Sequence, residues 1–377
     1  MRKSICFITA VPGTARAFLK GHIAALTKEY DVYLVADIKS EEEVAGLALT
    51  GWHRIGIERK ISIWRDIKAV WATFRYFRQM KFDAVHSVTP KAGLVTALAA
   101  KLASIKHRTH IFTGQVWATR KGLLRFVLKS IDKVIVLCDN HIMLDGLSQR
   151  AFMENEGVIP KGQARVFGYG SISGVKLERF VISDEVRQTE REKFELKDDD
   201  IVYVFMGRLN HDKGIGELYE AFNKLVVECP KSKLLLYGTD EEGYEAKAAA
   251  YANLKRDENF FYPGRTSKPF EALQCGDVFV LPTWREGFGT SVIEAQALGL
   301  PVITSDAYGV VDASLPNVTG LRCKVNDPEG LYKCMKHYYE HPELRKKHGE
   351  AGRKRVFDLF DSNVVTEAWV EYYKDIL

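Results

Sequence analysis

Short apolar runs rich in β-branched residues alternate with longer segments of helical periodicity along the whole chain. Such alternation is typical of parallel sheets with helices on both faces. The predicted strands are Ile5–Ala10, Val32–Ala36, Ala84–Ser87, His110–Thr113, Lys133–Leu137, Ile201–Met206, Lys233–Tyr237, Val278–Leu281 and Val302–Thr304. The pattern therefore predicts an α/β protein with doubly wound, Rossmann-like parallel sheets.

The series of strands restarts near residue 201, after a charge-dense stretch at 183–200. We therefore predict two Rossmann-like domains that face each other across a cleft, and ligands at the carboxyl ends of both sheets. A final helix carries Trp369, Tyr372 and Tyr373, and we expect it to dock back on the first domain. The predicted parts are 1–185, 186–360 and the helix at 361–377.

The N-terminus resembles a signal peptide, because Arg2 and Lys3 precede the apolar run Ser4–Val11. We interpret the run as a first strand, since it is short and leads into a helical segment and the strand Val32–Ala36. No run reaches the roughly 18–20 apolar residues that a membrane-spanning helix needs. The six cysteines lack the spacing of a zinc site or a disulfide framework. We expect a cytoplasmic protein whose membrane contact, if it has any, is peripheral.

Charge is distributed unevenly between the two halves. Residues 1–180 contain 28 Lys and Arg against 15 Asp and Glu, whereas the remainder contains 26 against 34. The net charge of +5 thus combines +13 with −8. A basic half favours a polyanion, an anionic membrane surface or a phosphate-bearing ligand.

The segment at 278–299 carries the most specific chemistry. A buried strand ends at Pro282, a glycine-containing turn follows, and a helix is predicted from Thr290. The free amides of Gly289, Thr290 and Ser291 would then lie at a helix N-terminus. The helix dipole and unpaired N–H groups at such a terminus favour a diphosphate.

Two glutamates flank this predicted anion site. Glu286 in the turn can accept hydrogen bonds from a sugar, and Glu294, one turn into the helix, can accept them from the two hydroxyls of a ribose. The alternative is that Glu286 is a solvated turn residue and Glu294 an ordinary charge on a helix surface. The strand-turn-helix context favours the ligand-binding interpretation.

A second cluster follows the predicted strand Ile201–Met206. Gly207 allows a sharp turn, and Arg208 and Lys213 can reach the same edge of the sheet to neutralise a diphosphate. Exposed loop cations are the alternative. Downstream, the segment Phe261–Arg265 ends another strand and is a candidate to border a nucleobase.

These motifs resemble glycosyltransferase family 4, which has the GT-B fold, and the resemblance extends over nearly the whole chain. It lies in the pairs Gly207-Arg208 and Lys213-Gly214 and in the run Glu286-Gly-Phe-Gly-Thr-Ser-Val-Ile-Glu294. The resemblance implies that Arg208 and Lys213 hold the donor diphosphate. It also implies that Glu294 holds the ribose and Glu286 the transferred sugar, so that Arg208, Lys213 and Glu286 are the catalytic candidates. The predicted donor-binding residues are Gly13, Gly207, Arg208, Lys213, Arg265, Glu286, Gly287, Phe288, Gly289, Thr290, Ser291 and Glu294.

Two motifs in the first half of the chain resemble one group of enzymes within this family. Residues 86–93 and 112–117 look like those of bacterial enzymes that elongate undecaprenyl-diphosphate-linked glycans for capsule or O-antigen. Phe112 stands where many relatives carry a histidine, so we assign no catalytic role there. Gly13 corresponds to a glycine-containing loop of the family, although this chain lacks the usual double glycine. The candidate acceptor-binding residues are His86, Lys91 and Thr113. For His86 the alternative is a satisfied histidine at a strand end.

Aromatic and basic residues interleave at 52–81, where the cations include Arg59 and Lys60. The apolar members at helical spacing are Trp64, Ile67, Trp71 and Phe74. This pattern is typical of an interfacial amphipathic helix on an anionic membrane surface, and the basic segment at 120–129 can extend it. The alternative is that the apolar stripe packs on the sheet and the cations are merely solvated.

Together these features predict a retaining glycosyltransferase of bacterial surface polysaccharide synthesis. We expect it to transfer a hexosyl or N-acetylhexosaminyl group from a nucleotide diphosphate, preferably a UDP-sugar, to an undecaprenyl-diphosphate-linked glycan. Its predicted place is the inner face of the plasma membrane, by peripheral contact. The retaining stereochemistry is implied by the family resemblance.

We expect no metal and no cofactor. Asp198-Asp-Asp200 has the DxD pattern of metal-dependent sugar transferases, but we interpret it as a turn before the next strand. Two alternatives to a transferase remain, a GT-B nucleotide-sugar epimerase and a basic nucleic-acid-binding protein. The second lacks any helix-turn-helix, zinc or RNP-type pattern, so we expect no nucleic-acid partner. A nicotinamide dehydrogenase is disfavoured because no GxGxxG follows the first strand.

Overall fold

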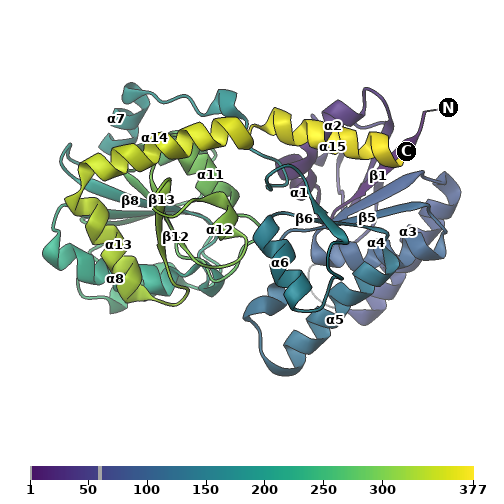
Figure 1. The fold of residues 1–377 in the computed structure, drawn as a ribbon, viewed down its shortest axis with the longest axis horizontal. Helices are drawn as coiled ribbons and strands as arrows, with labels where there is room; N and C mark the ends of the chain where they lie inside the picture. Colours follow the sequence, from purple (N-terminus) through teal and green to yellow (C-terminus); the bar gives the residue numbers. More distant parts are fainter. Residues whose placement is uncertain (1, 58–61) are drawn as a thin grey trace. The chain divides into compact units, whose positions relative to one another are not determined.

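The computed structural model describes residues 2–57 and 62–377, which fold as two units (Figure 1). Unit 1 comprises the chain up to Gly174 together with Ser362–Leu377, and unit 2 comprises Val175–Asp361. Within the described residues, each unit has one parallel sheet, of seven strands in unit 1 and six in unit 2. The predicted α/β class with two doubly wound sheets is confirmed.

Unit 2 begins earlier in the chain than the boundary predicted at 185/186. The amide of Val175 donates to the carbonyl of Phe360 over 2.7 Å, and Val175 and Phe180 are buried in the core of unit 2. The charge-dense stretch that suggested the boundary is mostly helix α7 (Asp184–Glu192). The burial of Val175 and Phe180 ahead of this helix therefore sets the boundary between the units. The change in composition along the sequence does not mark it.

The sheet of unit 1 has the order β3-β2-β1-β4-β5-β6-β7, and every neighbouring pair is parallel. Its strands are β1 (Ser4–Ile8), β2 (Asp31–Ala36), β3 (Gly51–Arg54), β4 (Ala84–Val88), β5 (His107–Phe112), β6 (His141–Leu144) and β7 (Ala164–Val166). Side chains alternate across β1, so that Ile5 and Phe7 face one core cluster while Cys6 and Ile8 face another. The first apolar run is thus an interior strand, flanked by β2 and β4.

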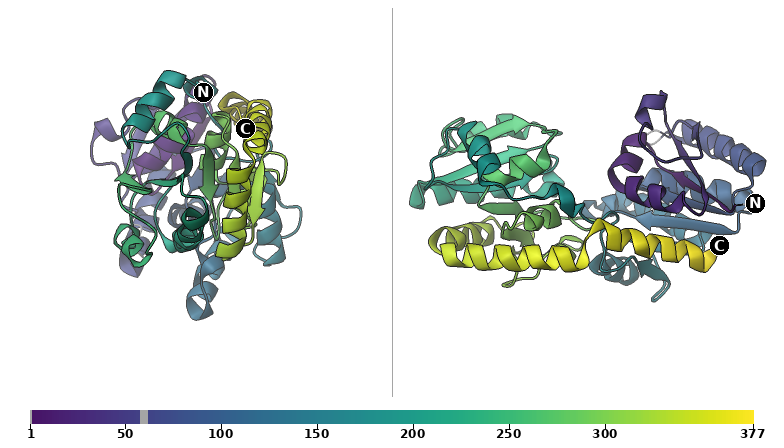
Figure 2. Two further views of the ribbon diagram at one scale, coloured as in Figure 1. Left: turned by 90° about the vertical axis from the view of Figure 1, so that its left-hand side faces the viewer. Right: turned by 90° about the horizontal axis from the view of Figure 1, so that it is seen from above.

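Helices cover both faces of this sheet (Figures 1 and 2). The helices α2 and α15 pack on the face of Phe7, whereas α3, α4 and α5 pack on the face of Cys6 and Phe112. The helices and short helical turns are α1 (Pro12–Thr14), the π-helical turn η1 (Ala15–Leu19), α2 (Lys20–Leu26), η2 (Glu41–Glu43), α3 (Ile63–Met80), α4 (Pro90–Leu102), η3 (Val116–Thr119), α5 (Gly122–Cys138), α6 (Leu147–Asn155) and α15 (Ser362–Ile376).

The last helix, α15, supplies the largest side chains of the core on the Phe7 face of unit 1. Trp369 and Tyr373 are completely buried, and Trp369 stacks on the rings of His22 and His86 at centroid distances of 4.6 and 4.8 Å. In Figure 1, α15 is the yellow helix beside α2, which it contacts. The final segment of the chain is therefore part of the core of unit 1.

One predicted strand is wrong, because Lys133–Leu137 is the end of helix α5. Its β-branched run favours a strand locally, but tertiary packing overrides that preference. In the helix, Ile135 packs into the core while Leu137 lies exposed on the surface. The strand at this place in the sheet is β6, which begins after α5. The pattern also missed four short strands, β3, β6, β7 and β13, each of only three or four residues.

The sheet of unit 2 has the order β10-β9-β8-β11-β12-β13, again all parallel. Its strands are β8 (Ile201–Met206), β9 (Ser232–Tyr237), β10 (Phe260–Gly264), β11 (Val278–Leu281), β12 (Val302–Ser305) and β13 (Gly320–Cys323). Because β9 and β11 lie on opposite sides of β8, the strand order reverses there. The carboxyl ends of β8 and β11 thus border the switch point, where open α/β sheets bind ligands.

The helices of unit 2 enclose a single large core cluster of described residues. The helices and helical turns are η4 (Leu177–Arg179), α7 (Asp184–Glu192), η5 (His211–Lys213), α8 (Ile215–Glu228), α9 (Tyr244–Lys247), η6 (Ala248–Ala250), α10 (Pro269–Ala272), η7 (Leu273–Cys275), α11 (Thr290–Ala297), α12 (Val310–Ala313), α13 (Pro328–Glu340) and α14 (Pro342–Leu359). No helix in the described parts of either unit is long and apolar enough to cross a membrane.

Candidate functional site

The two motif-bearing loops of unit 2 follow neighbouring strands and are hydrogen-bonded to each other. The loop after β8 is Gly207–Gly214, and the loop after β11 is Pro282–Gly289. The amide of Trp284 donates to the carbonyl of Asp212 over 2.8 Å, and the hydroxyl of Thr283 donates to the same carbonyl over 2.8 Å. Three of the predicted charged residues, Arg208, Lys213 and Glu286, therefore lie on two loops that hydrogen bonds join.

Two glycines permit the close approach of these loops. Gly214 has φ of +70°, and a Cβ there would lie 2.1 Å from the carbonyl oxygen of Pro282. Gly309, in the loop after β12, has φ of +84°, and a Cβ there would lie 2.4 Å from the carbonyl oxygen of Glu286 and 2.8 Å from that of Gly287. Any larger residue at either position would push the loops apart. Gly309 was not predicted from the sequence, because its partner is distant along the chain.

Lys213 and Glu286 form an ion pair between the loops. The Lys213 ammonium contacts Oε1 of Glu286, and each side chain is only 16% exposed. The structure thus brings together the residue predicted to bind a diphosphate and the residue predicted to bind the adjoining sugar. A cation and an acceptor in direct contact suit a ligand in which a phosphate adjoins a hydroxylated ring.

A second ion pair lies one residue earlier on each loop. Arg285 donates from Nε and Nη2 to Oδ2 of Asp212, over 3.0 and 2.6 Å, and both side chains are mostly buried. This pair adjoins Lys213 and Glu286 in sequence, so it fixes the backbone from which both extend. Sequence reasoning missed it, because the pairing depends on β8 and β11 being neighbours.

Arg208 has a different partner from Lys213. It donates to both carboxylate oxygens of Glu241, over 3.2 and 3.1 Å, and Asn210 donates to the same carboxylate over 2.8 Å. Glu241 follows β9, on the other side of β8 from β11. The structure therefore places Arg208 at the same edge of the sheet as Lys213, but in an exposed pair with a carboxylate that the sequence did not reveal.

The N-terminus of α11 lies where the sequence predicts it. Gly289 has φ of +95° and precedes the first helical residue, Thr290; Thr290 and Ser291 are both half-buried. The first amides of a helix have no partner within the helix, and the dipole makes this end favourable for an anion. Phe288, however, is buried, and its ring lies 5.2 Å from that of Phe360. The ring therefore belongs to the core, and the donor contact of Phe288 stays a prediction.

Glu294 is an unpaired acid one turn into α11. Burial raises the pKa of its carboxyl to about 7, although part of the residue remains accessible to solvent. Among the described residues, no hydrogen bond or ion pair satisfies this carboxyl. An acid with a perturbed pKa and no partner inside the protein is typical of a ligand-binding site. Its accessible oxygens suit two adjacent hydroxyl donors.

Two other predicted donor residues are less closely connected to this group. Gly207 donates its amide to the carbonyl of Tyr237 over 2.9 Å and so continues the sheet. Arg265 is exposed and follows β10, the edge strand, which β9 separates from β8. Within the described residues no contact joins Arg265 to Lys213 or Glu286.

In unit 1, three predicted residues lie at one edge of the sheet. Gly13 is exposed and follows β1, Lys91 begins α4 just after β4, and Thr113 directly follows β5. Carboxyl ends of parallel neighbours meet at a common edge, so these residues border the ligand-binding edge of unit 1. Lys91 pairs with Asp66 at the start of α3 over 2.8 Å.

His86 is not at that edge surface, and its predicted contact with an acceptor is wrong. It is completely buried, its Nδ1 lies 2.8 Å from the hydroxyl of Tyr373, and its ring stacks on Trp369. Burial among these rings lowers the pKa of His86 well below its ordinary value. The alternative of a histidine buried in the strand core is the one that fits, although only its Nδ1 has a hydrogen-bond partner among the described residues. Phe112 is also buried, with its ring edge against His110 at 4.3 Å.

The aromatic-basic patch forms the outer face of α3. The buried face of α3 includes Ala69, Thr73 and Phe77, and the predicted apolar stripe lies outside these three residues. The stripe members Trp64, Ile67 and Trp71 are exposed, and Phe74 is half-buried against Trp71. The alternative in which the stripe packs on the core therefore holds for Phe74, and three of the four stripe members lie outside the core. Arg59 and Lys60 lie outside the described residues.

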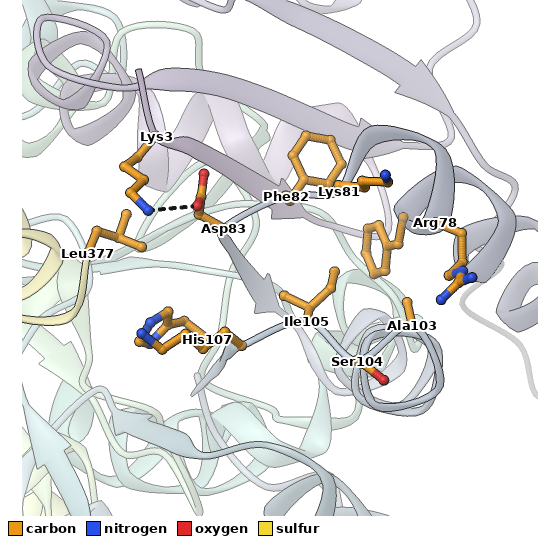
Figure 3. A pocket seen from close by; sticks show the side chains of 12 residues that line it. Lys3, Arg78, Lys81, Phe82, Asp83, Ala103, Ser104, Ile105, His107 and Leu377 are labelled. Atoms are coloured by element: carbon orange, nitrogen blue, oxygen red, sulfur yellow. Dashed lines mark hydrogen bonds and ion pairs between the residues drawn. The ribbon is translucent and has the colours of Figure 1, made fainter. Parts of the chain in front are cut away.

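A cavity of about 470 Å³ lies at the opposite edge of the sheet of unit 1, near the amino ends of β1, β4 and β5 (Figure 3). It is lined by Lys3 and Asp83, which form an ion pair at 3.1 Å, and by Arg78, Lys81 and His107 among others. None of the predicted site residues lines it.

The DxD-like acids form a turn, as predicted. Asp200 accepts from the amide of Lys197 over 2.8 Å, and Asp199 pairs with Lys231 over 2.5 Å. Over the ranges 2–57 and 62–377, no group of three or more His, Cys, Asp or Glu is placed to hold a metal ion. Asp199 and Asp200 make these contacts in the turn before β8.

Comparison with known proteins identifies the family. The family model for "Glycosyl transferases group 1" matches residues 186–355, and that for a "Glycosyl transferase 4-like domain" matches residues 15–142. The capsular polysaccharide biosynthesis glycosyltransferase CapM of Staphylococcus aureus is 30% identical over 360 residues, which cover 95% of this chain and 94% of CapM. The chain belongs to glycosyltransferase family 4.

One further relative and one solved structure of similar fold add to the comparison. An N,N′-diacetylbacillosaminyl-diphospho-undecaprenol α-1,3-N-acetylgalactosaminyltransferase of Campylobacter jejuni is 25% identical, over 80% of each chain. HepE of Anabaena, solved in complex with UDP and glucose, has a TM-score of 0.82 and 14% identity over 99% of this chain and 100% of its own. At that identity the likeness concerns the fold alone, which is GT-B.

Proposed function

We propose that this glycosyltransferase moves a sugar from a nucleotide diphosphate, most suitably a UDP-sugar, to a glycan carried on a lipid diphosphate. The observation that carries the donor assignment is the contact of Lys213 with Glu286, next to the N-terminus of α11 and its unpaired Glu294. The cation and the helix amides suit a diphosphate, and the two acids suit the hydroxyls of the adjoining sugar and of the ribose.

We assign the residues as follows. Lys213 and the first amides of α11 hold the diphosphate, Glu294 accepts from the ribose hydroxyls, and Glu286 orients the transferred sugar. Arg208 assists when it leaves the exposed pair with Glu241, since the phosphate offers it a more concentrated negative charge. Arg265 and Gly13 remain proposed donor contacts.

The proposed transfer proceeds with retention. The bond from the anomeric carbon to the diphosphate oxygen breaks, and the acceptor oxygen forms its bond on the same face. The acceptor proton passes to the departing diphosphate. Cations and amides that stabilise the leaving charge then supply most of the rate enhancement. We propose that no metal takes part, so a chelator should leave the rate unchanged.

The proposed acceptor is an undecaprenyl-diphosphate-linked glycan in the synthesis of a bacterial capsule or O-antigen. The names of CapM and of the Campylobacter enzyme support this, since one concerns capsular polysaccharide and the other a diphospho-undecaprenol acceptor. Lys91 and Thr113 are the proposed acceptor contacts in unit 1. Such an acceptor places the enzyme at the cytoplasmic face of the plasma membrane.

A kinetic comparison of two lysine variants tests the donor assignment. With a panel of UDP-, GDP- and dTDP-sugars, Lys213→Ala should lower kcat/KM for the preferred donor by about 10²–10³-fold, as for loss of one group that stabilises a transition-state charge. The control is Lys224→Ala, which removes the exposed pair of Lys224 on α8 with Glu329 on α13 and should stay within twofold. Unchanged kcat/KM in Lys213→Ala would refute the assignment, and conversion of the donor alone to an epimeric nucleotide sugar would favour the epimerase.

A further inference from the structure

Large apolar side chains are exposed on two helices of unit 1, α3 and α5, which both contact α4. On α3 and on α5 they include Trp64 and Leu123, which are 79% and 77% exposed. We name this set the apolar rim, and its members are Trp64, Ile67 and Trp71 of α3 and Leu123, Leu124, Phe126 and Val127 of α5. Single exposed apolar residues are ordinary on protein surfaces, but a cluster of this kind marks an interaction site.

The topology places both parts of the apolar rim at one edge of unit 1. The helices α3, α4 and α5 each lead from the carboxyl end of one strand to the amino end of the next, so each begins at the carboxyl edge of the sheet. Every rim residue lies in the first half of its helix. α4 contacts both α3 and α5, and Lys91 at its start pairs with Asp66 of α3. The rim thus borders the edge that carries the proposed acceptor contacts.

The charges around the apolar rim are mostly positive. Lys68, Arg120 and Lys121 are exposed beside it. The nearby acids are already engaged within the protein: Asp66 pairs with Lys91, and Glu156 pairs with Arg125 and Lys129. Asp132 on α5 is buried and accepts from the indole of Trp117. Apolar side chains ringed by cations complement an anionic lipid surface, where the cations reach the headgroups and the apolar groups enter the acyl region.

We propose that the apolar rim inserts into an anionic lipid bilayer, so that the first halves of α3 and α5 lie in the membrane interface. The proposal rests on the proposed function in one respect, that a lipid-linked acceptor requires the carboxyl edge of unit 1 to face the membrane. A second copy of this chain is a less suitable occupant, because two like-charged surfaces would repel each other.

Helix α5 offers a matched pair of leucines for the test. Leu123 is in the apolar rim, whereas Leu137, 74% exposed, lies at the other end of the same helix, at the opposite edge of the sheet. Binding of the full chain is measured by co-sedimentation with vesicles of phosphatidylglycerol and phosphatidylethanolamine, without substrates. Leu123→Glu and Phe126→Glu should each lower the vesicle partition coefficient by ~10-fold or more, whereas Leu137→Glu should stay within twofold.

Each outcome decides the proposal. Equal partition of Leu123→Glu and Leu137→Glu would overturn it, as would equal binding of the unaltered chain to neutral phosphatidylcholine vesicles. A dimer in sedimentation velocity that Leu123→Glu dissociates, with no vesicle binding by either protein, would assign the surface to self-association instead. UDP binding is measured on the same samples. If Leu123→Glu loses vesicle partition but keeps UDP binding, the proposed membrane role of the apolar rim is supported. Absence of UDP binding in the unaltered chain counts against the proposed function alone.

Discussion

The ion pair of Asp212 with Arg285 offers a sharp test of how the two loops are held. Asp212→Ala removes two charge-assisted hydrogen bonds, of 3.0 and 2.6 Å, and leaves a mostly buried guanidinium without that carboxylate. Hydrogen bonds to charged groups contribute about 1.5–3 kcal/mol each. Because both bonds end on one oxygen, and the backbone bonds from Thr283 and Trp284 remain, we expect a coupling energy near the lower end. A double-mutant cycle with Arg285→Ala should give about 2 kcal/mol.

The same variant should lower catalysis, because Lys213 and Glu286 adjoin the broken pair. A partial displacement of groups that position a substrate costs about 10–100-fold in kcat/KM, equivalent to about 1.4–2.8 kcal/mol. The assay is transfer of the preferred sugar at subsaturating donor, together with denaturant unfolding of the same samples.

A second pair in unit 2 provides the control for a purely structural loss. Asp277 accepts from Arg187 over 2.6 Å and from the amide of Val202 over 2.8 Å, just before β11 and thus at the opposite edge of the sheet. Asp277→Ala should destabilise the protein at least as much as Asp212→Ala, yet keep kcat/KM within twofold where the protein remains folded. The reasoning is refuted if Asp212→Ala retains kcat/KM within twofold, or if both variants lose it equally.

Two further predictions concern Glu294 and Trp369. The pKa of about 7 at Glu294 means that its carboxylate, the form that we propose accepts from a ribose, is populated only as pH rises through neutrality. Titration calorimetry between about pH 6 and 8 should therefore show UDP affinity rising more steeply in the unaltered enzyme than in Glu294→Gln; parallel profiles would contradict this. The raised pKa also means that the free energy of unfolding of the ligand-free protein falls as the pH rises from about 4.5 to 7. Glu294→Gln should remove that dependence. Trp369→Ala should lower the free energy of unfolding of unit 1 by about 3–5 kcal/mol, whereas exposed Trp71→Ala should change it by under about 0.5 kcal/mol, as denaturant titrations of the two can establish.

Much of the proposed donor site can be predicted from the sequence because its signals are local. A strand, a glycine turn and a helix start are readable in a short window, and α11 begins at Thr290 as predicted. Lys213 and Glu286 meet because parallel strands deliver their loops to one edge of the sheet. Such loops need only the right strand order to come together.

The features that the sequence did not reveal depend on contacts between distant segments. The partner of Arg208 is Glu241, on a third loop, and the approach of Gly309 to Glu286 joins loops after different strands. His86 was misassigned for the same reason, since the helix that covers it comes at the far end of the sequence. Hydrophobic periodicity shows that a helix docks, but it does not show which residues the helix covers.

The return of α15 to unit 1 has a consequence for biosynthesis. The ribosome makes most of unit 1 first, then all of Val175–Asp361, and only then the segment that fills the core with Trp369 and Tyr373. At about 5–20 residues per second, this delay is on the order of tens of seconds. During that interval a nascent chain exposes an apolar groove on one face of its first sheet, while unit 2 can already close. The enzyme therefore completes its domains in the reverse of the order in which it starts them, and chaperones have a defined window in which to act.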